Sequence, residues 1–152
     1  HRVTLIASGG ILTGFHMARA LALGADLCAS ARGMMLALGC IQALRCNSGH
    51  CPTGITTQNP ALVHGLDVEN KTSRVTRYHS ATVRSLQELL GAMGLSQPSE
   101  LGPQHIFRRV TDSHVRNFAQ IHEFLDKGAL LADGSVTGPW KEDWLTACEK
   151  SN

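Results

Sequence analysis

The chain has 152 residues, of which 43% are hydrophobic and 17% are charged, and its formal net charge is +2 at pH 7. These values exclude a disordered chain and are typical of one ordinary globular domain. The basic residues are spread along the chain, so we expect no nucleic-acid partner. No apolar run approaches the roughly 18 residues of a membrane-spanning helix, so we expect no membrane span in this segment.

The first predicted element is a strand over residues 3–7, where the sequence is apolar and β-branched. A glycine-containing turn follows, and apolar residues then recur with helical spacing as far as Gly24, with Thr13 as the N-cap. Leu27–Ala29 is predicted to form a second strand. A connection of about twenty residues predicts a βαβ unit, in which the two strands are parallel.

Most of the remaining chain is predicted to be helical. A second helix should begin at Arg32 or Gly33 and continue to Leu44, and residues 46–60 should form an ordered loop that is rich in proline, glycine and polar residues. Helical spacing returns over residues 73–93, and shorter helices are predicted at the segments 99–107, 113–125 and 141–148.

Only two strands are found, and two parallel strands cannot close a sheet. The chain also opens without an initiator methionine and enters the first strand at once. We therefore expect it to be a piece of a longer protein whose preceding part supplies the other strands.

Two successive turns are candidates for an anion-binding site. The first strand is followed by Ser8, Gly9 and Gly10, where the backbone can approach a ligand closely and the next helix begins. The second strand ends before Ala31 and Arg32, again in front of a helix. Helix N-termini bind phosphate, and (β/α)8 barrels commonly build such a site after strands 7 and 8. The alternative is that these glycines are only turn residues.

Three cysteines form a C-x5-C-x4-C array, at Cys40, Cys46 and Cys51. A six-residue step on an ideal helix rotates about 240°, so the helix has to end between the first two for their sulfurs to meet. Thiolates select zinc or iron–sulfur clusters. Zinc would need a fourth ligand, and His50 is a poor candidate because it adjoins Cys51, so a cluster with three cysteine ligands fits better. Cysteines without a metal are the alternative.

The chain contains five cysteines, an odd number that indicates metal binding more than a disulfide framework. This usage favours a reducing compartment, and we expect the cytoplasm. The two cysteines outside the array, Cys28 and Cys148, are interpreted as packing residues.

Several of these motifs together resemble one known family, the FMN-binding synthase domain of glutamate synthase. They are the run Ser-Gly-Gly-Ile-Leu-Thr-Gly at 8–14, Gly-Ala-Asp at 24–26, the cysteine spacing from 40 to 46, and Cys-Pro-Thr-Gly-Ile-Thr-Thr-Gln at 51–58. The chain is most similar to the stand-alone FMN-binding glutamate synthase family proteins, which carry Ala-Arg-Gly-Met-like residues after the last strand. The motifs span residues 3–60, and residues 78–144 resemble the family tail more weakly.

The resemblance implies an α/β fold, namely the C-terminal portion of a (β/α)8 TIM barrel followed by a mostly α-helical tail. Residues 1–60 would hold the last two βα units of the FMN-binding barrel and the iron–sulfur cluster loop. Residues 61–152 would form a helical C-terminal tail that packs on the barrel.

The resemblance also implies two cofactors, FMN at the C-terminal ends of the strands and a 3Fe–4S cluster beside it. Cys40, Cys46 and Cys51 then correspond to the cluster ligands. The residues that fall where the family holds the FMN phosphate are Gly9, Gly10, Ala31 and Arg32, with Ser8 flanking the loop. Glutamate synthases proper usually have Gly-Thr at the position of residues 31 and 32.

The reaction implied by the family is the reductive conversion of 2-oxoglutarate and ammonia, delivered from glutamine, into glutamate. Electrons pass from the iron–sulfur cluster to FMN, which reduces 2-iminoglutarate by hydride transfer. The implied partners are an ammonia-supplying glutaminase domain or subunit, an electron donor protein and the remainder of the barrel. Residues that hold 2-oxoglutarate are expected in earlier strands, so no catalytic residue is assigned and this chain alone is expected to be inactive.

Two other functions compete with this interpretation. One is a non-redox, phosphate-binding barrel fragment related to nucleotide dehydrogenases, which share a Gly-Gly-Ile turn but use a lone catalytic cysteine. The other is a structural zinc module, which would be colourless.

Overall fold

The structure is a computed structural model that describes residues 3–126, 128–131, 138 and 140–149, with the backbone alone at 131, 148 and 149. The chain divides into two compact units, His1–Phe118 and Ala119–Asn152. The candidate site lies in the first unit.

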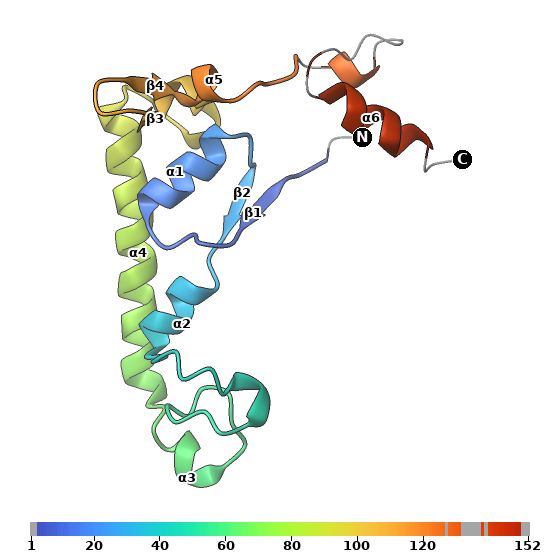
Figure 1. Cartoon of the computed structure of the whole chain (residues 1–152). Helices are drawn as coiled ribbons and strands as arrows, with labels where there is room; N and C mark the ends of the chain where they lie inside the picture. Colours follow the sequence, from blue (N-terminus) through green and yellow to red (C-terminus); the bar gives the residue numbers. More distant parts are fainter. Residues whose placement is uncertain (1–2, 127, 132–137, 139, 150–152) are drawn as a thin grey trace. The chain divides into compact units, whose positions relative to one another are not determined.

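The first unit begins with a βαβ motif made of β1 (Ile6–Ser8), α1 (Gly14–Ala22) and β2 (Leu27–Ala29) (Figure 1). The two strands are parallel, and Ile6 is paired with Leu27. Helix α1 begins where the Thr13 side chain accepts a hydrogen bond from the His16 N–H, at 3.3 Å. The predicted parallel pair and its N-cap are therefore confirmed, while the barrel around them stays a prediction.

Helix α2 (Arg32–Leu38) is shorter than predicted. It ends at Gly39, whose φ of 105° is left-handed, and the Cys40 N–H donates to the Met35 carbonyl at 2.9 Å. This arrangement is a glycine C-cap, which stops a helix because glycine adopts positive φ at no steric cost. The prediction that the helix reaches Leu44 is wrong, and Cys40 lies just beyond the helix.

The segment after α2 is the ordered loop that was predicted. It contains a 3₁₀ turn at Cys46–Ser48 and the short helix α3 (Pro60–Val63), which begins with proline and is capped by the side chain of Asn59. Proline is favoured in the first turn of a helix because no partner is needed there for its missing N–H.

The longest element is α4 (Val68–Ala92), which lies along α1 and α2 (Figure 1). It begins five residues before the predicted start because Asp67 caps it, its side chain accepting from the Asn70 N–H at 3.2 Å. The buried side chains of the unit lie mainly between α1, α4 and the segment that follows them. They are Ile11, Ala18, Ala22, Cys51, Leu86, Leu90, Leu101, Ile106 and Phe118.

The chain after α4 differs from the prediction. Residues 99–107 form parts of two 3₁₀ turns, Pro98–Glu100 and Pro103–His105, instead of a helix. A hairpin of β3 (Phe107–Arg109) and β4 (Val115–Asn117) follows, so the expectation of only two strands is wrong. The predicted helix at 113–125 is reduced to α5 (Phe118–Ile121).

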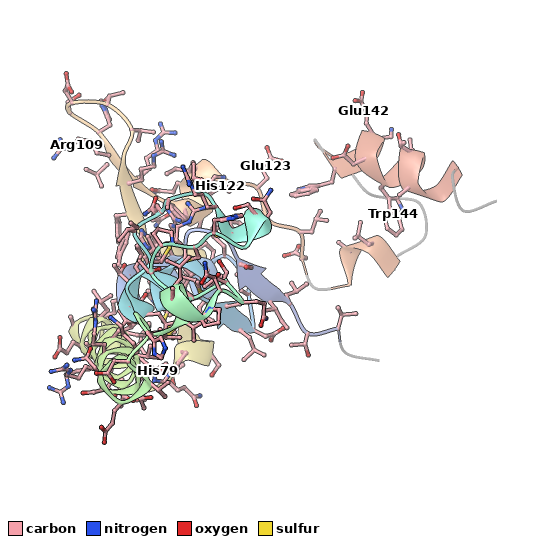
Figure 2. The ribbon with its side chains drawn as sticks, turned by 90° about the horizontal axis from the view of Figure 1, so that it is seen from below. His79, Arg109, His122, Glu123, Glu142 and Trp144 are labelled. Carbon is pink, nitrogen blue, oxygen red and sulfur yellow. The ribbon has the colours of Figure 1, made fainter. Side chains whose placement is uncertain are left out.

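The β3–β4 hairpin extends away from the other elements of its unit, with Arg109 near its tip (Figure 2). Its strand residues are mostly exposed, and Arg109 Nη1 donates to the Asp112 carbonyl at 2.8 Å. Contacts within the turn, such as this hydrogen bond, support a hairpin here, although the sequence pattern weakly predicts a helix.

The second unit contains a 3₁₀ turn at Ala129–Leu131 and α6 (Trp140–Glu149), which confirms the helix predicted at 141–148. Glu142 and Trp144 point to opposite sides of α6 (Figure 2). The side chain of Cys148 lies outside the described residues. No helix in the described part of the chain is long and apolar enough to cross a membrane.

Candidate functional site

One pocket of about 580 Å³ opens beside the C-terminal ends of β1 and β2. Its lining includes all five residues predicted to hold a phosphate and two of the three array cysteines, which are Ser8, Gly9, Gly10, Ala31, Arg32, Cys40 and Cys46. Parallel strands bind ligands at their carboxyl ends because the turns there lead into helix N-termini. The structure therefore brings the two predicted sites to one cavity.

The first turn presents its backbone openly to this pocket. Gly9 and Gly10 have φ values of 90° and 69°, and a Cβ built on either residue would meet no atom within 4 Å. Glycine is needed for the conformation at both positions. The turn therefore leaves space at its surface that a ligand can fill.

The second turn is fastened to the first. The Ser30 hydroxyl donates to the Ile11 carbonyl at 2.6 Å, and the Tyr78 hydroxyl of α4 donates to the Leu12 carbonyl at 2.8 Å. Ala31, the N-cap of α2, makes no side-chain capping bond. No pattern in the sequence indicates the role of Tyr78, because this residue lies 66 residues from its partner.

The three array cysteines surround a second, smaller pocket. Cys40, Cys46 and Cys51 line it together with Leu44 and Thr53, and its volume is about 10 Å³, the space of about one water molecule. Among the described residues, no group of three His, Cys, Asp or Glu side chains is placed so that it could hold a metal ion. The loop brings the three cysteines to one small pocket without placing them as metal ligands, and their assignment as cluster ligands stays a prediction.

Hydrogen-bond donors lie next to two of these sulfurs. The Gln42 N–H donates to Cys40 Sγ at 3.4 Å, and Thr53 Oγ1 lies 3.3 Å from Cys51 Sγ. The Thr53 hydroxyl and the N–H groups of Thr56 and Thr53 lower the pKa of Cys51 to about 6. Donors favour the thiolate, which is the form of cysteine that binds metals.

The backbone between Cys40 and Cys46 is strained. Gln42 and Leu44 have φ values of 55° and 56°, and they are the non-glycine residues with positive φ in the described part of the chain. Leu44 is also 88% exposed. Backbone strain of this kind costs on the order of 1–3 kcal/mol per residue and clusters at functional sites. Both residues line the larger pocket, although the sequence pattern placed them in a helix.

The loop also contains one buried polar side-chain atom. Thr56 Oγ1 is buried and has no well-formed hydrogen bond among the described residues, although its hydroxyl lies close enough to the Cys51 sulfur to help lower the pKa of that thiol. An unpaired buried hydroxyl costs about 1–3 kcal/mol. A bound group with acceptor atoms would give this hydroxyl a stronger partner.

Cys28 is separate from this site. It is half-buried in β2, its thiol faces the Met17 carbonyl at 4.0 Å, and burial raises its pKa. These properties agree with the packing role expected from the sequence.

A βαβ unit with a pocket at its strand ends and a cysteine-lined loop beside it places this chain among proteins that mix helices and strands, while the complete α/β barrel stays a prediction. The chain belongs to the glutamate synthase family, since the family model described as "Conserved region in glutamate synthase" matches residues 1–96. The glutamate synthase family predicted from the sequence is therefore confirmed, while FMN binding stays a prediction.

Individual relatives agree with this assignment. The chain is 39% identical over 125 residues to the glutamate synthase large subunit-like protein YerD of Bacillus subtilis, covering 82% of this chain and 24% of that protein. It is 41% identical over 101 residues to the archaeal glutamate synthase (NADPH) of Methanocaldococcus jannaschii, covering 66% and 20% of the two chains. The archaeal-type glutamate synthase (NADPH) of Thermotoga maritima is 32% identical over 111 residues, with 72% and 22% covered. The chain thus spans about a quarter or less of the length of these relatives.

Proposed function

We propose that this chain is part of a glutamate synthase-like flavoprotein oxidoreductase, in which it holds the phosphate of FMN and the ligands of a 3Fe–4S cluster. The observation that carries the proposal is the shared pocket, whose lining includes both Gly9 and Gly10 of the first turn and Cys40 and Cys46 of the array. Cys40 and Cys46 also line the smaller pocket with Cys51. A flavin and a cluster bound in these two spaces would be neighbours.

The residue types of both spaces suit the groups assigned to them, and the three cysteine side chains would have to rearrange around a cluster, because as they stand they are not placed to hold a metal ion. Ser8, Gly9, Gly10, Ala31 and Arg32 offer main-chain N–H groups and one guanidinium to a phosphate, while three cysteines offer thiolates to iron. FMN bound here would supply hydride transfer, and the cluster would supply one-electron transfer. The chain's own contribution is to place the two groups side by side and to donate hydrogen bonds to the cysteine sulfurs.

We further propose that the βαβ unit is the last quarter of a (β/α)8 barrel. Among the described residues, β1 and β2 pair only with each other, so each has a free edge. Val3, Ile6 and Leu27 are exposed by 76%, 62% and 54%. Such apolar surface and open strand edges favour burial against further strands, which the remainder of the barrel would provide.

The reaction proposed for the complete protein is the reduction of 2-oxoglutarate and ammonia to glutamate in the cytoplasm. A glutaminase domain or subunit would supply the ammonia, and an electron donor protein would supply the electrons. Membership of the glutamate synthase family supports this reaction over that of nucleotide dehydrogenases. This chain alone would be inactive, because the residues that bind 2-oxoglutarate are assigned to earlier strands.

The test uses the complete protein that contains this chain, purified without oxygen. We expect FMN in its visible spectrum, together with iron and acid-labile sulfide. Replacing Cys40, Cys46 or Cys51 by Ser should lower both iron and sulfide, whereas Cys28→Ser is the matched control and should leave them unchanged. Wild-type iron and sulfide in all three variants would exclude the cluster, and zinc in a colourless protein would favour the structural zinc module.

A further inference from the structure

The hydroxyl of Tyr78 reaches from α4 to the back of the first glycine turn. It donates to the Leu12 carbonyl at 2.8 Å, across a sequence separation of 66 residues, and the side chain is half-buried. Other described contacts between α4 and the βαβ unit include Leu86, which is an apolar core residue. A tyrosine that is buried usually places its hydroxyl against a specific acceptor, so this contact is a candidate for a specific role.

The same hydroxyl lies against the second turn. A Cβ built on Gly33, in the first turn of α2, would collide with the Tyr78 hydroxyl and would lie 2.7 Å from Ser30 Oγ. Gly33 is buried, and its φ lies outside the left-handed region, so glycine is required there for space and not for conformation. Tyr78 therefore occupies the room beside α2 that a side chain at Gly33 would need.

Ser30 provides a direct hydrogen bond between the two turns. Its hydroxyl donates to the Ile11 carbonyl at 2.6 Å, so two consecutive carbonyls of the first turn are held from outside it. The described part of the chain contains no cis peptide bond. Because a trans peptide unit is planar, fixing the carbonyl of Leu12 also fixes the direction of the next N–H group, that of Thr13.

We propose that Tyr78 is a positioning residue, which locks the turn at 8–14 against the turn at 30–33 so that both present their N–H groups to one phosphate. The inference rests on the proposed function, because it assigns that phosphate to FMN. Main-chain N–H groups bind an anion well only when their directions are fixed beforehand. Tyr78 never touches the ligand; it acts through Leu12 and Gly33.

A comparison of two flavins separates a role in phosphate binding from a role in fold stability. FMN and riboflavin share the ring system and the ribityl chain and differ by the phosphate alone. A residue that only stabilises the fold would affect both flavins equally. A residue that arranges the phosphate site would affect FMN and leave riboflavin unchanged.

The experiment measures flavin dissociation constants of the flavin-free complete protein by fluorescence titration. Tyr78→Phe removes one hydroxyl and should weaken FMN binding by about fivefold, the effect of one hydrogen bond, with riboflavin binding unchanged. Ser30→Ala should show the same selectivity, because it releases the other carbonyl. Thr72→Val is the matched control, since the Thr72 hydroxyl also donates to a carbonyl at 2.8 Å, that of Val68, but only within α4.

Each outcome decides the inference. Selective loss of FMN binding in Tyr78→Phe and Ser30→Ala, with Thr72→Val at the wild-type value, would establish it. Equal loss of both flavins, or no loss, in Tyr78→Phe would overturn it while leaving the proposed FMN site in place. A wild-type protein that binds riboflavin as tightly as FMN, or binds neither, would overturn the proposed phosphate site and this inference together.

Discussion

The two halves of the candidate site are built in different ways. The glycine turns are held by the parallel pair β1 and β2, by the Thr13 cap and by side chains from α4 and from the other turn. The cysteine loop is exposed over residues 41–50, and its backbone is left-handed at Gln42 and Leu44. The comparison indicates that the fold itself holds the glycine turns, the phosphate half of the candidate site. The cysteine loop, its cluster half, would gain further order from the metal proposed for it.

Removing the proposed cluster should produce the largest difference between the two halves, in the rate of amide hydrogen exchange. Because metal binding is coupled to folding of its loop, stripping the iron from the complete protein should speed amide hydrogen exchange in residues 40–56 by about a hundredfold. Exchange in α1 should stay the same. Mass spectrometry of peptides from both regions measures this, and equal acceleration in α1 would contradict the proposed division.

A methyl group added at Gly14 should destabilise the glycine-turn half strongly. A Cβ there would lie 2.6 Å from the Leu86 main-chain nitrogen and 2.8 Å from the Ser85 carbonyl carbon, and backbone atoms cannot move aside cheaply. We expect Gly14→Ala to lower the free energy of unfolding by about 2 kcal/mol, measured by urea denaturation.

Gly91→Ala is the matched control for this substitution. Gly91 lies in α4, and a Cβ there would meet nothing within 4 Å. Alanine is the better helix former, so this variant should be stabilised by about 0.5–1 kcal/mol. Destabilisation of equal size in both variants would show that α1 and α4 do not approach each other as the structure describes.

The sequence predicted the phosphate half better than the cluster half. The strands and the Thr13 cap depend on residues that are close in the chain, so their patterns are visible in the sequence. The sequence pattern predicts a second helix as far as Leu44, because apolar residues continue at helical spacing after Gly39. Ile41 and Leu44 are instead 66% and 88% exposed, so their hydrophobicity does not report core packing. The Gly39 cap was the available signal against that helix.

The contacts that depend on distant residues were not predictable in this way. Tyr78 has the same helical spacing as its apolar neighbours, and its bond to Leu12 spans 66 residues. The hairpin of β3 and β4 is short and exposed, so it lacks the alternating burial that identifies a strand. Both features arise from tertiary contacts that a periodic pattern does not encode.

The pH at which the cysteine loop loses its proposed iron should differ more moderately between variants. Hydrogen bonds hold the pKa of Cys51 at about 6, below the usual value, so its thiolate persists as pH falls until about pH 6. Thr53→Val removes the hydroxyl that lowers this pKa most, so the pKa of Cys51 should rise. The pH below which a chelator removes iron from the complete protein should then rise by about one unit.

Thr72→Val is the control for the pH experiment, because the Thr72 hydroxyl donates to the Val68 carbonyl at 2.8 Å on α4. Its iron-loss profile should match that of the wild type. A Thr53→Val profile that also matches the wild type would mean that the Thr53 hydroxyl does not stabilise the Cys51 thiolate.

The smallest expected effect comes from the strained backbone of the cysteine loop. Leu44 has a φ of 56° and is 88% exposed, so replacing it by glycine removes strain and loses little packing. Leu44→Gly should therefore raise the free energy of unfolding of the cluster-free protein by about 0.5–1 kcal/mol. Ala43→Gly is the neighbouring control, since Ala43 is not among the described residues with positive φ, and it should be destabilising. If both variants lose stability equally, the left-handed backbone at Leu44 is absent without the cluster, and the loop becomes ordered only when the metal binds.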